Sequence, residues 1–148
     1  MIKFIKSVAL ITLIVSCNSN SKNADASYSV TKETATPRDA LLKQSITNGK
    51  DIYDNFCINC HMANGKGVQN VFPPLADSDF LRNYQIKSIK AVKHGMSGKI
   101  VVNGTTYNSV MAPLGLTNKE VADVVNYINN SWGNTIDNFV TEEKVSKL

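Results

Sequence analysis

The residues best suited to chemistry in this 148-residue chain form one short run, in which Cys57 and Cys60 are separated by two residues and His61 follows directly. Two thiols at this spacing can reach two vinyl groups on one porphyrin, and the next side chain then lies under the ring centre. C-x-x-C-H is the attachment motif for c-type haem. The run predicts one covalent haem c, held by Cys57 and Cys60, with His61 as an axial ligand of the iron.

Two other kinds of site use cysteines at this spacing. A thioredoxin-like C-x-x-C is expected within a βαβ pattern and an apolar, proline-containing setting, and neither surrounds Cys57. A structural zinc ion needs four ligands, and after Cys57, Cys60 and His61 the strongest remaining candidate is His94. With three Cys and two His in the chain, chance explains the ordered motif poorly, so the haem interpretation is favoured.

A haem iron with His61 on one face can take a sixth ligand from the other face. Met62 is excluded because it is adjacent in sequence to His61, which leaves Met96, Met111 and His94. We predict Met111, in a proline-stiffened loop before the last helix, whereas His94 is also explained as a cation near a helix C-terminus. His/Met ligation raises the reduction potential of the iron.

The sequence resembles the class I cytochrome c family from about Gly49 to Trp132. The resemblance is carried by motifs in the family's order: Gly49, Tyr53, the haem motif, Phe72-Pro73-Pro74-Leu75, Met111-Ala112-Pro113, Val124 and Tyr127. It implies an all-α cytochrome c fold, with a few short helices around one covalent haem. It also implies that the Pro73 carbonyl accepts the proton of His61 Nδ1, although the two prolines could simply form a rigid apolar turn.

Hydrophobic periodicity predicts three main helices. The first covers residues 49–57, with Asn48 or Thr47 as its N-cap, and the second covers residues 83–94. The third starts at Thr117, which opens a Thr-Asn-Lys-Glu capping box, and should cross the first helix near its glycine.

A small β-hairpin is predicted over residues 99–107, because two β-prone runs flank Asn103-Gly104. A hairpin of this sort precedes the distal methionine in some bacterial cytochromes c that the chain resembles. Tyr107 could direct its hydroxyl toward a haem propionate, and packing alone explains this residue at least as well.

Several lysines form a basic stripe that has two explanations. Lys87, Lys90 and Lys93 share one side of the second predicted helix, and such a stripe is usually a solvated face. Together with Lys66 and Lys99 they could instead surround the haem edge and attract acidic redox partners, which would make electron transfer depend on salt.

The N-terminal residues predict export. Residues 1–16 combine Lys3 and Lys6 with an apolar stretch that is too short for a stable membrane span, as in a secretory signal. The following Ile-Val-Ser-Cys sequence resembles a bacterial lipobox, in which Cys17 becomes the lipidated first residue. The alternative is an ordinary signal peptide with an incidental Cys17.

The rest of the chain divides by composition. Residues 17–44 are polar and are expected to be a flexible tether, residues 45–133 the cytochrome c domain, and residues 134–148 a polar, peripheral tail. In some bacteria an aspartate directly after the lipidated cysteine resembles an inner-membrane retention signal. Residue 18 is an asparagine instead, which favours an outer-membrane anchor facing the periplasm.

The predicted function is that of an exported, lipid-anchored, monohaem one-electron carrier with redox proteins as partners. Two protein ligands on the iron leave no site for a small-molecule substrate, so we do not expect an enzyme. The formal net charge of +4 and the absence of a known motif do not suggest nucleic-acid binding. The alternatives are a cytochrome subunit of a larger oxidoreductase and, less favoured, a haem enzyme or gas sensor with an open sixth site.

Overall fold

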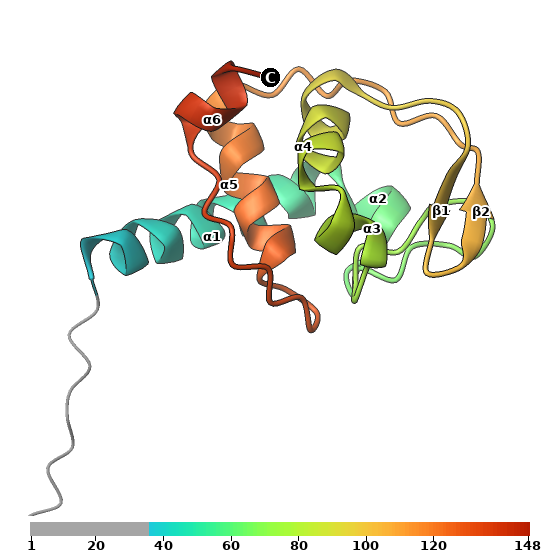
Figure 1. Cartoon of the computed structure of the whole chain (residues 1–148), viewed down its shortest axis with the longest axis horizontal. Coiled ribbons are helices and arrows are strands. Elements are labelled where there is room, and N and C mark those ends of the chain that lie inside the picture. The colour runs from blue at the N-terminus through green and yellow to red at the C-terminus, as the bar shows by residue number, and fades with distance from the viewer. Residues whose placement is uncertain (1–35) are drawn as a thin grey trace, which may run out of the picture. The chain divides into compact units, whose positions relative to one another are not determined.

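The computed structural model describes residues 36–148, so the predicted signal segment, Cys17 and most of the expected tether lie outside the described residues. The described part contains six helices and one two-stranded antiparallel sheet (Figure 1). The bounds are α1 Pro37–Phe56, α2 Ile58–His61, α3 Asp79–Asn83, α4 Gln85–His94, β1 Ile100–Val102, β2 Thr105–Tyr107, α5 Asn118–Asn129 and α6 Glu142–Ser146. The predicted all-α class with a small hairpin is confirmed.

The first helix begins at Pro37, so the predicted start at Gly49 and the predicted caps Asn48 and Thr47 are wrong. Thr36 is the N-cap. Its hydroxyl accepts the backbone N–H of Asp39 at 3.2 Å, and the Asp39 carboxylate accepts the N–H of Thr36 at 2.8 Å. Pro37 has its φ preset for the first helical position. Residues 37–44, expected as tether, therefore form the first two turns of α1.

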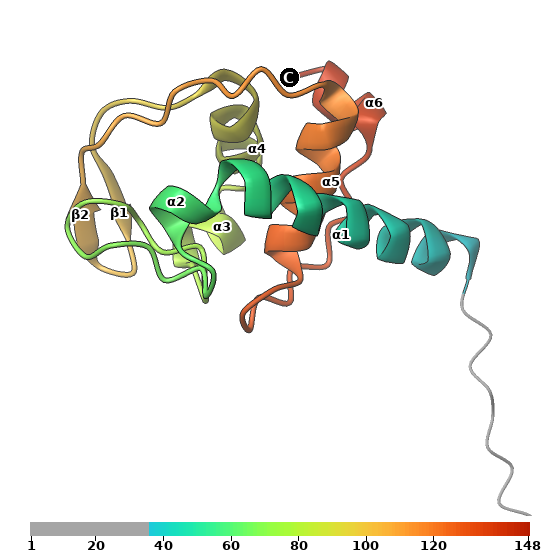
Figure 2. The same ribbon diagram turned by 180° about the vertical axis from the view of Figure 1, so that it is seen from behind.

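The crossing of α1 and α5 organises the fold (Figure 2). Gly49 of α1 lies against Asp123 and Tyr127 of α5 at this crossing. A Cβ atom at Gly49 would lie 2.0 Å from the carbonyl oxygen of Asp123 and 2.8 Å from Cβ of Tyr127. Only a glycine allows the two backbones to approach this closely. The predicted crossing is confirmed, as is the capping box that Thr117 and Glu120 form at the start of α5.

The hydrophobic core has two clusters that share α5. One consists of Tyr53, Cys57, Leu81, Val124 and Ile128, and the other of Ile89, Val121, Ala122, Val125, Val140 and Val145. α5 thus presents apolar residues to α1 on one side and to α4 and the C-terminal segment on another.

Residues 134–148 do not form a peripheral tail, and that prediction is wrong. Val140 and Val145 are 1% and 0% exposed, and α6 packs against α5. Asn126, fully buried in α5, donates Nδ2 to the Val140 carbonyl at 2.8 Å and accepts the Val140 N–H at 2.9 Å. The apolar residues of this segment follow no regular helical spacing among its polar residues, so the tertiary contacts reveal that it completes the core.

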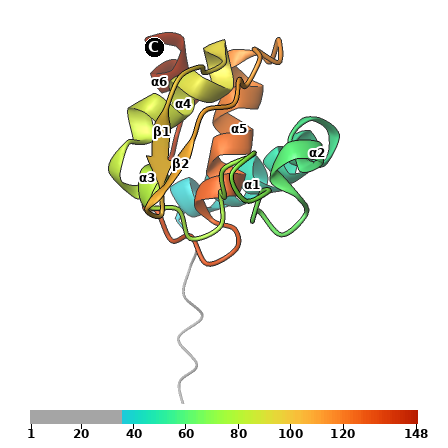
Figure 3. The same cartoon turned by 90° about the vertical axis from the view of Figure 1, so that its right-hand side faces the viewer.

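The predicted hairpin is present, with Asn103 and Gly104 at its turn and φ values of 48° and 76°. It lies beside α3, as Figure 3 shows. The N–H of Asn103 donates to Oδ1 of Asp79 at 2.7 Å, and the N–H of Asp79 donates to Oδ1 of Asn103 at 2.9 Å. No helix within residues 36–148 is both long and apolar enough to cross a membrane.

Candidate haem site

The C-x-x-C-H run forms a tight turn at the end of α1. Cys57 caps α1, its N–H donating to the Tyr53 carbonyl at 2.9 Å, and its own carbonyl accepts the N–H of His61 at 2.9 Å. This turn puts Cys57 and His61 on the same side of the chain, while Cys60 lies half-buried on α2. Burial, with Cys60 nearby, raises the pKa of the Cys57 thiol to about 11. Cys57 is therefore a neutral thiol at neutral pH.

The His61 ring has a fixed orientation and tautomer. Its Nδ1 lies 3.0 Å from the carbonyl oxygen of Pro73, and because a carbonyl can only accept, Nδ1 carries the proton. Burial lowers the pKa of His61, and the hydrogen bond to Pro73 opposes this shift without cancelling it. The neutral ring therefore has its lone pair on Nε2, as a metal ligand requires.

The loop after α2 brings the Pro73 carbonyl to His61. The N–H of Gly67 donates to the His61 carbonyl at 3.0 Å, and the N–H of Leu75 donates to the Gly65 carbonyl at 2.7 Å. Gly67 has a φ of +60°, and a Cβ there would lie 2.3 Å from the Phe72 carbonyl oxygen. The loop can close this tightly only with glycine at that position.

Three side chains anchor this loop from the other helices and the C-terminal segment. Tyr53 Oη donates to the Met62 carbonyl at 2.7 Å, Trp132 Nε1 to the Ala63 carbonyl at 3.0 Å, and Asn134 Nδ2 to the Leu75 carbonyl at 2.8 Å. Sequence reasoning missed Asn134, because a single asparagine beyond the last predicted helix gives no signal of burial. It is 4% exposed and holds the proline turn against the end of α5 through a second bond to the Ile128 carbonyl.

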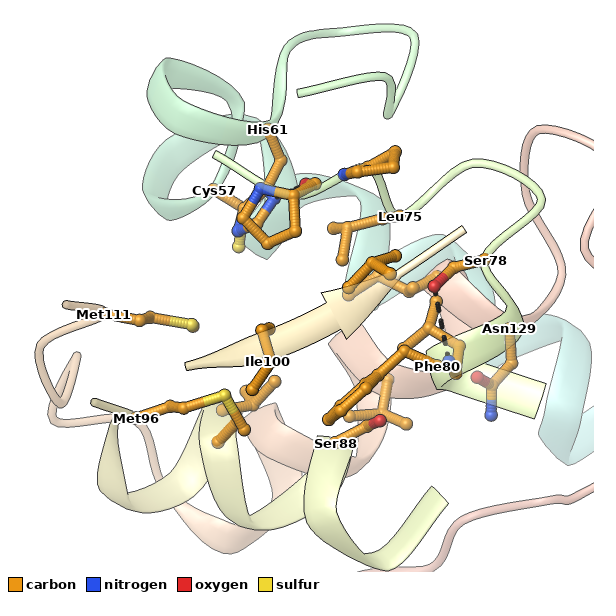
Figure 4. Close-up of a pocket in the computed structure, with 18 residues that line it drawn as sticks. Cys57, His61, Leu75, Ser78, Phe80, Ser88, Met96, Ile100, Met111 and Asn129 are labelled. Carbon is orange, nitrogen blue, oxygen red and sulfur yellow. Dashed lines mark hydrogen bonds between the residues drawn. The ribbon is translucent and has the colours of Figure 1, made fainter. Parts of the chain in front are cut away.

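These elements line a concave, largely apolar cavity (Figure 4), as is usual for cofactor sites. Its lining is predominantly apolar: Cys57, His61, Pro73, Pro74, Leu75, Ser78, Phe80, Leu81, Ser88, Ala91, Val92, Met96, Ile100, Val102, Met111, Val125, Ile128 and Asn129.

The polar side chains of the cavity wall are bonded within the protein. Ser88 Oγ donates to the Tyr84 carbonyl at 3.1 Å, and the Asn129 side-chain amide exchanges two hydrogen bonds with that of Gln85, at 3.0 and 3.1 Å. The site thus combines an apolar interior, a thiol, an imidazole and thioethers. That donor set fits a large apolar ring with a central iron.

Two of the three candidates for the sixth ligand line this cavity. Met96 and Met111 form an isolated antiparallel bridge, with both N···O distances at 2.8 Å. In Figure 4 their side chains lie together, on another side of the cavity from the His61 ring. His94 and Met62 are exposed and are not among the lining residues.

Tyr107, Lys87 and Lys93 each make a contact within the protein that bears on the role predicted for them. Tyr107 is 5% exposed, pairs with Ile100 across the hairpin and is not among the lining residues, so its contact with a propionate stays a prediction. Lys93 Nζ donates to the Val145 carbonyl at 2.9 Å, which ties α4 to α6. Lys87 lies over the Tyr84 ring, 4.7 Å from its centroid.

The zinc alternative gains no support from the structure. Among the side chains of residues 36–148, no group of three or more His, Cys, Asp or Glu is arranged to hold a metal ion. His94, the fourth ligand that such a site would need, is exposed at the end of α4.

Comparisons with known proteins show the family to which the chain belongs. A family model described as cytochrome c matches residues 46–132. The chain is 36% identical over 113 residues to cytochrome c-552 of Thermus thermophilus, covering 68% of this chain and 83% of that protein. It is also 35% identical over 104 residues to the cytochrome c subunit of a quinone alcohol dehydrogenase from Gluconacetobacter polyoxogenes, covering 68% of this chain and 22% of that subunit.

Proposed function

Since the chain belongs to the cytochrome c family of electron-transfer proteins, which bind haem c covalently, we propose that it carries one electron at a time on an iron ligated by His61 and Met111. The observation that supports this best is that these two residues, far apart in the sequence, line the same apolar cavity. Cys57 lines it as well and, with Cys60, is the proposed point of thioether attachment.

The protein's part in this function is to hold the ligands and exclude water. The haem, when bound, supplies an iron that alternates between Fe(III) and Fe(II). The hydrogen bond from His61 Nδ1 to the Pro73 carbonyl fixes the ring and increases its strength as a ligand. The Met111 thioether favours Fe(II), and the apolar wall disfavours the added positive charge of Fe(III). Both effects raise the reduction potential.

Two protein ligands on the iron leave no position for a substrate, so the proposal includes no catalysis. The test is rapid mixing of the purified, reduced protein with carbon monoxide. The proposal predicts a low-spin spectrum and slow, ligand-displacing binding. Rapid binding, limited only by carbon monoxide diffusion, would support the haem enzyme or gas sensor instead.

A second candidate function is that of a cytochrome subunit within a larger oxidoreductase. The similarity to the cytochrome c subunits of quinone alcohol dehydrogenases favours it, and those subunits are several times longer than the matched region. Purification of the chain from its native membrane in mild detergent distinguishes the two. A stoichiometric dehydrogenase partner supports the subunit, and a free cytochrome supports the mobile carrier.

Export and lipid anchoring are further parts of the proposal, supported by residues 1–17 of the sequence. Cleavage before Cys17 and acylation of its thiol would leave the haem domain attached to a bacterial membrane on its periplasmic side. Mass spectrometry of the mature N-terminus tests this. An N-terminal diacylglyceryl-cysteine supports the anchor, and an unmodified N-terminus at another residue contradicts it.

A further inference from the structure

Met96 and Met111 occupy equivalent positions in the wall of the haem cavity. The N–H of each donates to the carbonyl of the other at 2.8 Å, so the two residues are directly opposite in an antiparallel bridge. Opposite residues in such a pair project to the same face, with Cβ atoms about 4.5–5.5 Å apart. Both side chains line the cavity, and Figure 4 shows both sulfur atoms there.

The residue before Met96 allows the two backbones of the bridge to lie close together. Gly95 has a φ of +79°, and a Cβ there would lie 2.6 Å from the Met111 carbonyl oxygen and 2.9 Å from Cδ of Pro113. The end of α4 and the Met111 loop therefore lie so close that a side chain at position 95 would clash. The side chains are less constrained, because methionine has three rotatable bonds and adapts to irregular spaces.

From this pairing we infer that Met96 is a reserve axial ligand, whose thioether binds the iron when the Met111 thioether leaves it. The inference rests on the proposed His61/Met111 ligation and adds a second donor to it. The exchange breaks one Fe–S bond and forms another, with no proton or electron transferred. Its consequence is that the sixth position stays closed to external ligands.

The other side chains of the cavity are poorly suited to this role. Ser78 Oγ accepts the N–H of Leu81, and the Ser88 hydroxyl donates to the Tyr84 carbonyl. The Asn129 amide is engaged with Gln85. Of the described residues that line the cavity, Met96 is then the one soft donor besides Met111 and the thiol of Cys57, which lies on the His61 side.

The experiment compares four purified holoproteins: wild type, Met111→Ala, Met96→Leu and the double variant. Each is assayed by the weak far-red sulfur-to-iron absorption band and by carbon monoxide binding to the reduced form. We expect Met111→Ala to retain a shifted band and to bind carbon monoxide more slowly than the double variant. The double variant should lose the band. A fifth holoprotein, Met62→Leu, removes an exposed methionine that does not line the cavity; it is the matched control and should resemble wild type.

Loss of the band in Met111→Ala, with carbon monoxide binding as fast as in the double variant, would overturn the inference and leave the proposed function intact. Absence of the band in wild type would instead refute the His/Met ligation itself. If Met111→Ala yields no folded holoprotein, Met111→Leu keeps the side-chain volume and is judged by the same two measurements. A band that persists there supports the reserve ligand, and its loss overturns it.

Discussion

The substitution Gly49→Ala should destabilise the fold, because it adds one carbon atom where α1 crosses α5. The new Cβ would lie 2.0 Å from the Asp123 carbonyl oxygen and 2.5 Å from its carbonyl carbon. Neither neighbour can rotate away, since both belong to the backbone of α5. The helices must separate by about 1 Å to restore even a tight 3.0 Å contact.

Two effects of opposite sign decide how much Gly49→Ala changes the free energy of unfolding. Alanine stabilises an α-helix by about 1 kcal/mol relative to glycine. Overpacking a close contact costs about 1–3 kcal/mol and sometimes more, and here the contact is between backbones. The separation would also loosen Tyr53 against Val124 and Ile128 in the cluster beside the haem motif. We expect a net loss of about 2 kcal/mol, a fall in the unfolding temperature of about 8 °C for a domain of this size.

The assay is thermal and denaturant unfolding of the holoprotein, followed by circular dichroism and by the haem absorption. Thr47→Ala is the matched control, since it lies two residues away in the same helix on the exposed face and also gains helix propensity. We expect the control to be unchanged or slightly more stable. A Gly49→Ala protein as stable as the control would refute the close-crossing argument.

Three further predictions concern the loop anchor, the C-terminal segment and a helix cap. Burial raises the pKa of Tyr53, so its contribution to the free energy of unfolding is complete below about pH 10 and is lost as the pH rises further. Tyr53→Phe removes the hydrogen bond to the Met62 carbonyl and should lower the free energy of unfolding by about 1 kcal/mol at neutral pH. In urea titrations the variant should also lose less stability than wild type as the pH rises above about 10. Val145→Ala should lower the free energy of unfolding by about 2 kcal/mol, whereas Val110→Ala, at a site 73% exposed, should change it little; equal effects would contradict the buried C-terminus. Hydrogen bonds from the N-cap Thr117 lower the pKa of Glu120, so its contribution to the free energy of unfolding is present above its unfolded pKa and is lost as the pH falls. Glu120→Gln should therefore lose less stability than wild type as the pH is lowered. An unchanged dependence of stability on acid pH would contradict the capping box.

The elements that local sequence specifies were predictable. The Thr117 capping box, the Asn103-Gly104 turn and the helix crossing at Gly49 each depend on residues close together in the chain or on a pattern carried by the family resemblance. The bridge between Met96 and Met111 was not predictable, although both residues were named as candidates. Their pairing depends on how the chain returns after the hairpin, which local patterns do not specify.

The two wrong boundaries have different causes. The start of α1 was readable in principle, since Thr36, Pro37 and Asp39 form a capping box with proline at the first helical position, but the polar composition around them favoured a tether. In the C-terminal segment, local sequence offers a helix N-cap at Thr141 followed by two glutamates, but nothing that indicates burial. Val140 is buried because Asn126, fourteen residues earlier, satisfies both of its backbone groups. Such long-range pairing of a buried amide with the backbone is invisible to periodicity.

The most direct test of the central claim is a spectroelectrochemical titration of the purified holoprotein, following the haem absorption as the potential is varied. We expect a single reversible transition with a one-electron Nernst slope and a low-spin spectrum at both ends. A transition with a two-electron slope, or a reduced form that becomes five-coordinate and high-spin, would contradict a one-electron carrier whose iron is held by His61 and Met111.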